Sequence, residues 1–240
     1  MADHETGDGA ARAATLVDIG DNAAIADPAG LGLAGFAMTT VLLSLVNSGA
    51  IEGGAVNAVL PLALLYGGAA QLLAGMWEFR NRNTFGAVAF SSFGAFWISF
   101  YLLVKFWLPG LSAGEASGAV GFYLLMWGIF TFSMWIASFR TDLVVWFVFL
   151  SLWVTYGLLA AGALGGQTGA YHMVYEAGGY AGIVCGVAAW YRAFAGVTNA
   201  TFRATVVPVG LLGTRTLGPL RPRRARPGAG PVADQSRVAP

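Results

Sequence analysis

Residues 30–49 read GLGLAGFAMTTVLLSLVNSG, an uninterrupted run without a single charged side chain. A helix needs about 20 mainly apolar residues to cross the hydrocarbon core of a bilayer. The run does not alternate apolar and polar side chains, as a membrane-spanning strand would. This stretch therefore predicts a transmembrane α-helix.

Five further segments of similar composition follow, at about residues 58–78, 86–108, 118–138, 142–165 and 174–194. The chain of 240 residues is 57% hydrophobic and only 10% charged, whereas a soluble protein carries about 25% charged residues. That composition excludes a water-soluble enzyme, and a net charge of +1 excludes a nucleic-acid reader. The prediction is an all-α polytopic protein of the cell membrane, with six transmembrane helices in contact with the lipid bilayer.

The two ends of the chain differ from this core. Residues 1–25 are rich in acidic side chains, and residues 205–240 combine prolines with arginines. Both compositions are typical of disordered segments. The predicted organisation is therefore a six-helix domain at 26–204 between two disordered ends.

The basic residues predict the orientation of the six spans. Of the 13 Lys and Arg residues, all but Lys105 fall on the side of the termini, including Arg80, Arg82 and Arg140 in short loops. Because Lys and Arg are enriched in cytoplasmic loops, both termini are expected to be cytoplasmic.

Groups that support covalent or metal chemistry are scarce. The single cysteine, Cys185, excludes a disulfide framework, and His4 and His172 lie far apart in the sequence. An enzyme within the bilayer would need a nucleophile beside a base, or a set of metal ligands. No catalytic residue, metal or cofactor is therefore expected, and no acidic or basic group is expected deep within a span.

Mild polarity instead follows one face of the first two spans. Phe36, Thr39, Thr40 and Asn47 recur at helical steps in the first, and Gln71 lies in the second. Such groups either join helices and bond back to their own backbone, or they line a path for a solute. For a single Ser or Thr we prefer the packing interpretation, whereas buried amides need several partners and favour a lumen.

The first span begins at ADPAGLGL, residues 26–33. Asp27 suits the N-cap, and Pro28 suits the first helical position, where no N–H is needed. A helix N-terminus that faces a pore attracts an anion through its free amides. Ordinary capping at the membrane surface is the simpler interpretation of the same residues.

Three motifs in order resemble those of the acetate uptake transporter family, also called the GPR1/FUN34/YaaH family. DPAGLGL at 27–33, followed by AGFAMTT, resembles the family signature NPAPLGL. YGGAAQLLAGMWEF at 66–79 and NTFGAVAFSSFGAFW at 83–97 are similar to the patterns of its second and third helices. The resemblance covers residues 26–210. It implies six-helix subunits that assemble into hexamers, each with its own path for acetate and, in some members, succinate.

The resemblance also implies the residues of that path. Phe36, Phe93 and Leu152 would form a hydrophobic constriction, flanked by Thr39, Thr40, Tyr66 and Gln71, with Asn47 on the same face as Phe36 and with Asp27, Pro28, Leu31 and Gly32 in the signature. Three positions depart from the family pattern. Phe93 lacks the hydroxyl of the tyrosine that is common there, Gly30 replaces the second proline of the signature, and Asp27 replaces its asparagine. An ionised Asp27 would repel an anionic substrate.

The expected function is transport of acetate or a similar small carboxylate through a pore in each subunit. The sequence leaves open whether flow is channel-like or coupled to protons, although the lack of a carboxylate in mid-span favours a substrate that carries its own proton. The alternative is a membrane sensor or scaffold for acetate adaptation, which would not need a polar face. A third open point is the repeat Gly178, Gly182 and Gly186, which serves either packing within a subunit or contact between subunits.

Overall fold

The computed structural model describes residues 25–210 and 212, and its elements are all helical in that part of the chain. They are α2 (Ala29–Asn47), η1 (Gly53–Ala55), α3 (Val56–Leu64), η2 (Leu65–Ala70), α4 (Gln71–Arg80), α5 (Thr84–Leu102), η3 (Leu103–Trp107), η4 (Leu108–Gly110), α6 (Ala113–Ala137), η5 (Ser138–Arg140), α7 (Leu143–Leu164) and α8 (Ala170–Phe202). Joined end to end, these elements give six helices long and apolar enough to cross a membrane. The predicted all-α membrane fold is confirmed.

The last helix is longer than the apolar segment that predicted it. The apolar run covers 174–194, but α8 continues for 33 residues, from Ala170 to Phe202. At about 1.5 Å per residue such a helix measures roughly 50 Å, well beyond the roughly 30 Å of the hydrocarbon core. Hydropathy marks only the part of a helix that lies within the hydrocarbon core, so we expect α8 to extend past the membrane at its C-terminal end.

The second span is not a regular helix. Pro61 lies inside α3 and has no N–H to donate, and the π-helical segment η2 follows it before α4 begins. The α2 helix approaches this segment closely. A Cβ on Gly67 would lie 2.6 Å from the Thr39 hydroxyl oxygen, so only glycine fits between the two spans there.

Glycines also bring α2 and α8 together. A Cβ on Gly186 would lie 2.6 Å from the Val41 side chain, and one on Gly179 would lie 2.6 Å from the backbone of Asn47. Gly182 faces Ser44 in the same contact. The small-residue repeat of α8 therefore packs within one subunit, which answers the question that the sequence left open.

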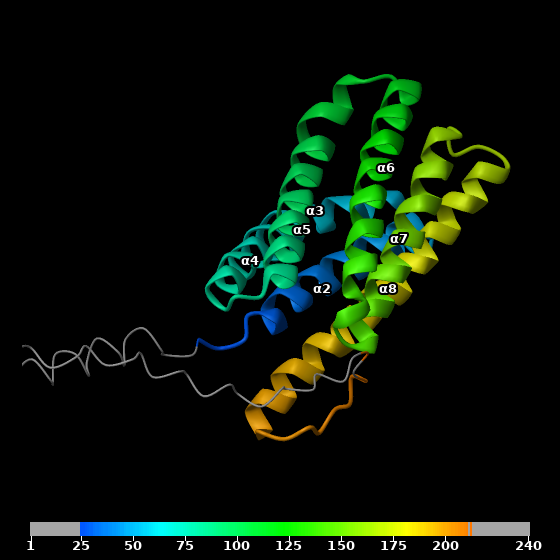
Figure 1. Cartoon of the computed structure of the whole chain (residues 1–240). Coiled ribbons are helices and arrows are strands. Elements are labelled where there is room, and N and C mark those ends of the chain that lie inside the picture. Colours follow the sequence, from blue (N-terminus) through cyan, green and yellow to red (C-terminus); the bar gives the residue numbers. More distant parts are fainter. Residues whose placement is uncertain (1–24, 211, 213–240) are drawn as a thin grey trace, which may run out of the picture.

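The helices lie side by side, and the described chain begins and ends at the same end of the bundle (Figure 1). We call this the terminal end; it also carries the turns at 81–83 and 138–142. The opposite loop end carries the turns at 48–55, 108–112 and 165–169. Arg80, Arg82 and Arg140 lie at the terminal end, so the positive-inside rule predicts that this end faces the cytoplasm.

A C-terminal strap, residues 204–210, turns back from the end of α8. The Asn199 side chain donates to the Val207 carbonyl at 2.8 Å and accepts from the Val206 amide at 2.8 Å. The Gly210 carbonyl then accepts from the Leu143 amide at 2.6 Å, at the start of α7. The predicted tail at 205–240 thus begins with residues bonded to the helices, whereas most of that segment, and most of the predicted segment at 1–25, lies outside the described residues.

Candidate functional site

The larger of two cavities opens at the loop end and has a volume of about 450 Å³. We call it the loop cavity. Its walls come from α2, α5, α6 and α7, and none of the described residues that line it is charged. Its lining is mostly aliphatic and aromatic, and the aromatic side chains include Phe96, Trp97, Phe100, Tyr123, Tyr156 and Tyr175. The cavity suits a small, partly apolar solute.

Hydroxyl and amide groups supply the polarity of the loop cavity. The Tyr175 hydroxyl donates to the Asn47 amide oxygen at 3.4 Å. The Thr40 hydroxyl is buried without a hydrogen-bond partner among the described residues. A buried hydroxyl without a partner is costly, so Thr40 is a ready donor for a polar solute.

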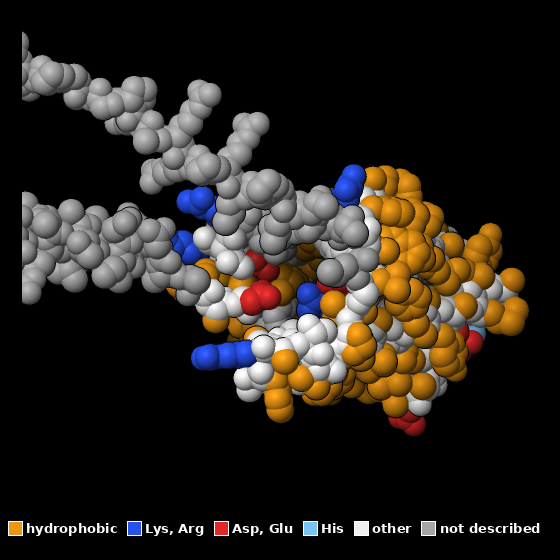
Figure 2. Space-filling model, turned by 60° about the horizontal axis from the view of Figure 1, so that its bottom comes forward, with side chains coloured by type: hydrophobic (Ala, Val, Ile, Leu, Met, Phe, Trp, Pro, Cys, Tyr) orange, Lys and Arg blue, Asp and Glu red, His pale blue; other side chains and the backbone are white. Residues whose placement is uncertain are grey.

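The smaller terminal cavity has a volume of about 170 Å³ and a different character. Its lining includes the amides Gln71 and Asn83 and the charged residues Glu78, Asp142 and Arg192. The Arg192 Nε–H donates to Asp142 at 2.7 Å, which ties α8 to the start of α7. Seen from this end, acidic and basic side chains surround a hollow with hydrophobic walls (Figure 2).

The two cavities meet at the same pair of residues, since Phe36 and Leu152 line both of them. The exposed fractions of these side chains are 4% and 3%. The Phe93 ring lies 5.8 Å from the Phe36 ring and 6.1 Å from the Phe149 ring, centroid to centroid. We call the layer formed by Phe36, Phe93, Phe149 and Leu152 the neck.

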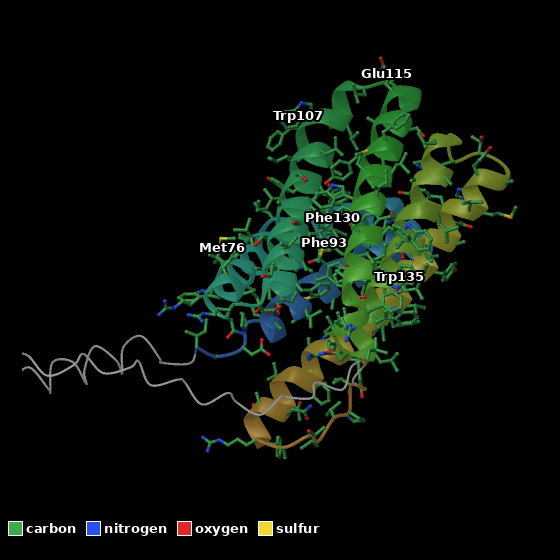
Figure 3. The ribbon with its side chains drawn as sticks, in the orientation of Figure 1. Met76, Phe93, Trp107, Glu115, Phe130 and Trp135 are labelled. Atoms are coloured by element: carbon green, nitrogen blue, oxygen red, sulfur yellow. The ribbon has the colours of Figure 1, made fainter. Side chains whose placement is uncertain are left out.

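Figure 3 shows Phe93 beside Phe130 midway along the bundle, with Trp107 and Glu115 towards the loop end. The Phe93 and Phe130 centroids are 5.6 Å apart, in an edge-to-face arrangement. The ring centroid of Trp127 also lies 6.0 Å from that of Phe93. Offset and edge-to-face pairs of this kind stabilise packing beyond their buried area. Phe93 is therefore held from several sides.

The structure brings some of the predicted site residues together on this path. Phe36, Thr40, Asn47, Gln71, Phe93 and Leu152 line one cavity or both. Gln71 is 1% exposed, and its amide oxygen has no hydrogen-bond partner among the described residues. Asn47 and Gln71, the two amides that favoured a lumen, therefore line the loop cavity and the terminal cavity respectively.

Other predicted residues lie away from both cavities. Thr39 donates to the Gly35 carbonyl at 2.9 Å within its own helix and faces the second span. Gly32 packs against the Phe90 ring, and Leu31 is 46% exposed on the surface. Tyr66 contacts Gly35 through its carbonyl group. These positions serve helix packing and the outer surface in this structure.

Asp27 and Pro28 lie at the start of α2 outside the cavities. Asp27 is exposed, and its carboxylate accepts from the Ala29 amide at 2.9 Å. The predicted cap is wrong by one residue, because α2 begins at Ala29 with Pro28 as its N-cap; Asp27 precedes the cap and bonds to the first helical amide. The helix start nevertheless lies beside the path, because Ala29 lines the terminal cavity.

Three features of the site were not found from the sequence. Phe149 packs on Phe93, and its spacing of three residues before Leu152 was the available signal. The Arg192–Asp142 pair joins residues 50 positions apart. Glu78, close to the end of α4, has no exposed surface at all. The expectation that no acidic group lies deep within a span concerned the middle of a span, whereas Glu78 lies two residues before the end of α4 and is buried there by neighbouring helices.

Comparisons with known proteins agree with the motifs. The succinate-acetate/proton symporter SatP of Escherichia coli K12 is 39% identical over 191 residues, which cover 79% of this chain and 97% of SatP. The ammonia transport outward protein 2 of Saccharomyces cerevisiae is 40% identical over 179 residues, covering 72% of this chain and 62% of that protein. A solved structure, described as that of the bacterial acetate channel SatP, superimposes with a TM-score of 0.70 at 38% identity and covers 78% of this chain and 100% of its own.

The relatives are named as transport proteins, in agreement with the prediction that this chain is not an enzyme. The profile of the GPR1/FUN34/yaaH family matches residues 16–213, which is most of the chain. This match includes all six spans. The chain is a multi-pass membrane protein and belongs to the GPR1/FUN34/yaaH family.

Proposed function

We propose that this chain carries acetate, or a similar small carboxylate such as succinate, across the membrane through the loop cavity, the neck and the terminal cavity. The observation that carries the proposal is that cavities from opposite ends of one subunit meet at Phe36 and Leu152. A sensor or scaffold has no need of such a path. The names of SatP, a succinate-acetate/proton symporter and an acetate channel, support the substrate class.

The neck determines the form in which the substrate crosses. A carboxylate ion that leaves water for an apolar layer loses its hydration, which is very costly without a compensating partner. Phe36, Phe93 and Leu152 offer no hydrogen-bond donor there. The neutral acid therefore crosses more easily than the anion, and the substrate carries its own proton through the neck.

Polar groups on both sides hold the substrate before and after this step. Thr40 and Asn47 lie on the loop side, and Gln71, Asn83 and Arg192 lie on the terminal side. All of these donors except Arg192 are uncharged, and uncharged donors bind a small acid without holding it too tightly to leave, as conduction requires. By resemblance to its family, the chain assembles into hexamers in which each subunit has its own path.

Uptake of labelled acetate into proteoliposomes, with and without an imposed pH gradient, tests the proposal. The expected result is saturable uptake above that of empty liposomes, faster when the gradient drives the acid inward. Competition by succinate, lactate and ammonium identifies the preferred solute, since one yeast relative is named for ammonia transport. No uptake of any of these solutes by folded protein would favour the sensor or scaffold.

We expect Gln71→Ala to lower acetate uptake roughly threefold to tenfold, the loss that corresponds to about one hydrogen bond. The amide lines the terminal cavity and is nearly fully buried, with its oxygen unpartnered. Initial rates in proteoliposomes, corrected for the amount of protein inserted, measure the effect. Asn57→Ala is the matched control, because the Asn57 amide is exposed and bonds only to the nearby Gly54 carbonyl among the described residues. Equal rates for both variants would remove Gln71 from the path.

We expect Asp27→Asn to keep the fold and to transport acetate as well as the wild type or better near neutral pH. Asparagine restores the family residue, and its side-chain oxygen still accepts from the Ala29 amide. The negative charge beside the path is lost, so an anion is no longer repelled. A folded variant without transport at any pH would show that the carboxylate itself is required.

A further inference from the structure

Glu78 is a buried acidic residue that forms no ion pair within the described part of the chain. Its side chain has no exposed surface, and neither carboxyl oxygen makes a hydrogen bond of normal geometry among the described residues, although the amide side chains of Asn81 and Asn83 lie close to it. It lies near the end of α4 and lines the terminal cavity. A buried charge is normally paired or hydrogen-bonded, so an unpaired carboxyl group that faces a transport path calls for a functional explanation.

Glu78 packs against α5 at the wall of the terminal cavity. A Cβ on Gly86 would lie 2.7 Å from a Glu78 carboxyl oxygen, so glycine lets the acid rest against α5. Three charged groups face it: Asp27 ahead of α2, Asp142 at the start of α7, and Arg192 on α8. Among the described residues, the side chains of α5 that line the terminal cavity are all uncharged. Asn83, the N-cap of α5, is a neutral amide.

Arg192 provides the positive charge of the cavity. Asp142 takes the Nε–H of the guanidinium with one carboxylate oxygen, and its other oxygen accepts from the Val145 amide at the start of α7. Neither terminal nitrogen of Arg192 donates a hydrogen bond within the part of the chain that the structure describes. A guanidinium binds a carboxylate well through such nitrogens. Asp142 thus acts as a positioning residue that aims Arg192.

We infer that Glu78 and Arg192 form a deprotonation site for the transported acid, an inference that rests on the proposed function. The acid reaches the terminal cavity in its neutral form after it passes the neck. Its carboxyl O–H gives the proton to a Glu78 carboxylate oxygen, and the resulting substrate carboxylate binds Arg192. Glu78 then releases the same proton to water at the terminal end, and the anion leaves. One proton and one carboxylate cross together, and Glu78 returns to its starting state.

The test compares Glu78→Gln with the wild type in proteoliposomes that hold the same pH on both sides. Glutamine keeps the size of the side chain but takes up no proton. At neutral pH, we expect uptake of labelled acetate to fall at least about tenfold, which is less than the roughly 10²–10⁴-fold that a positioned proton acceptor contributes to proton transfer. At acidic pH, the acid leaves without losing its proton, so the variant and the wild type take up acetate at similar rates.

Two further variants separate this role from a structural one. Glu78→Asp retains a titratable carboxyl group and restores part of the rate at neutral pH. Glu115→Gln makes the same chemical change in the exposed capping box at the start of α6 and leaves the pH profile unchanged. A purely structural role for Glu78 would lower the rate by the same factor at every pH.

The outcomes distinguish the inference from the proposed function. A wild-type chain that moves no acetate contradicts the proposed function and the inference with it. If the wild type transports acetate, two results for the folded Glu78→Gln variant overturn the inference alone. One is an unchanged pH profile, and the other is a loss of rate that is equal at every pH. A loss confined to neutral pH, partly restored by Glu78→Asp, supports it.

Discussion

Proteoliposomes that contain Leu152→Ala take up lactate at least about tenfold faster than those that contain the wild type, while acetate uptake is retained. Leu152 is 3% exposed and lines both cavities, so its side chain is part of the wall where the path is narrowest. Packed interiors relax only partly around a deleted side chain, and the truncation therefore leaves a gap. That gap admits the extra hydroxyl and carbon of lactate. Initial uptake rates of labelled acetate, lactate and succinate measure the change in selectivity.

Truncation of a buried leucine also costs about 2–5 kcal/mol of stability, so folding needs its own control. Leu60→Ala provides it, because Leu60 is 6% exposed in α3 but lines neither cavity. We expect this variant to lose stability without gaining lactate uptake. Unchanged selectivity in a folded Leu152→Ala protein would place the constriction elsewhere.

The second large effect concerns stability. We expect Gly179→Ala to destabilise the protein by about 1–3 kcal/mol or more, because a Cβ there would lie 2.6 Å from the backbone of Asn47 and Ser48. Backbone atoms cannot rotate aside as a flexible side chain can, so α2 and α8 must separate. Gly157→Ala is the matched control: a Cβ at this exposed position of α7 meets no atom within 4 Å. It should be neutral or gain up to about 1 kcal/mol, since alanine favours a helix.

The chain supplies its own probe for this measurement. Cys185 is the single cysteine and is fully buried on α8. A dye that fluoresces on reaction with thiols therefore reports unfolding as the detergent-solubilised protein is heated. A midpoint for Gly179→Ala equal to that of the wild type would show that the two helices tolerate a wider separation.

The spans were predictable because each is a local signal. About 20 apolar residues in a row define a membrane helix wherever the rest of the chain lies, and α2 was placed to within two residues of its bounds. The break at Pro61 and η2 was not predicted, since the apolar run continues through it. Whether a proline in an apolar run merely bends the helix or leads into a π-turn depends on its neighbours in three dimensions.

The site was predictable only in part, because one helical residue turns the side chain by about 100°. Thr39 and Thr40 were placed on the same face, yet Thr40 lines the loop cavity and Thr39 packs against the second span. The pairing of Asp142 with Arg192 depends on how α7 crosses α8, which periodicity does not encode. The burial of Glu78 could not be predicted for a related reason. A carboxylate near a helix end normally reaches water, and here α5 covers it.

The C-terminal strap has a consequence for the order in which the protein is completed during synthesis. The first amide of α7 bonds to the carbonyl of Gly210, which leaves the ribosome only after all six spans have been made. Until then the turn that carries Asp142 lacks this hydrogen bond, and Arg192 on α8 is also synthesised late. The terminal cavity is thus the last part of the path to be finished. A nascent chain that stops before the strap contains every span but lacks the hydrogen bond that joins the strap to the start of α7 beside this cavity.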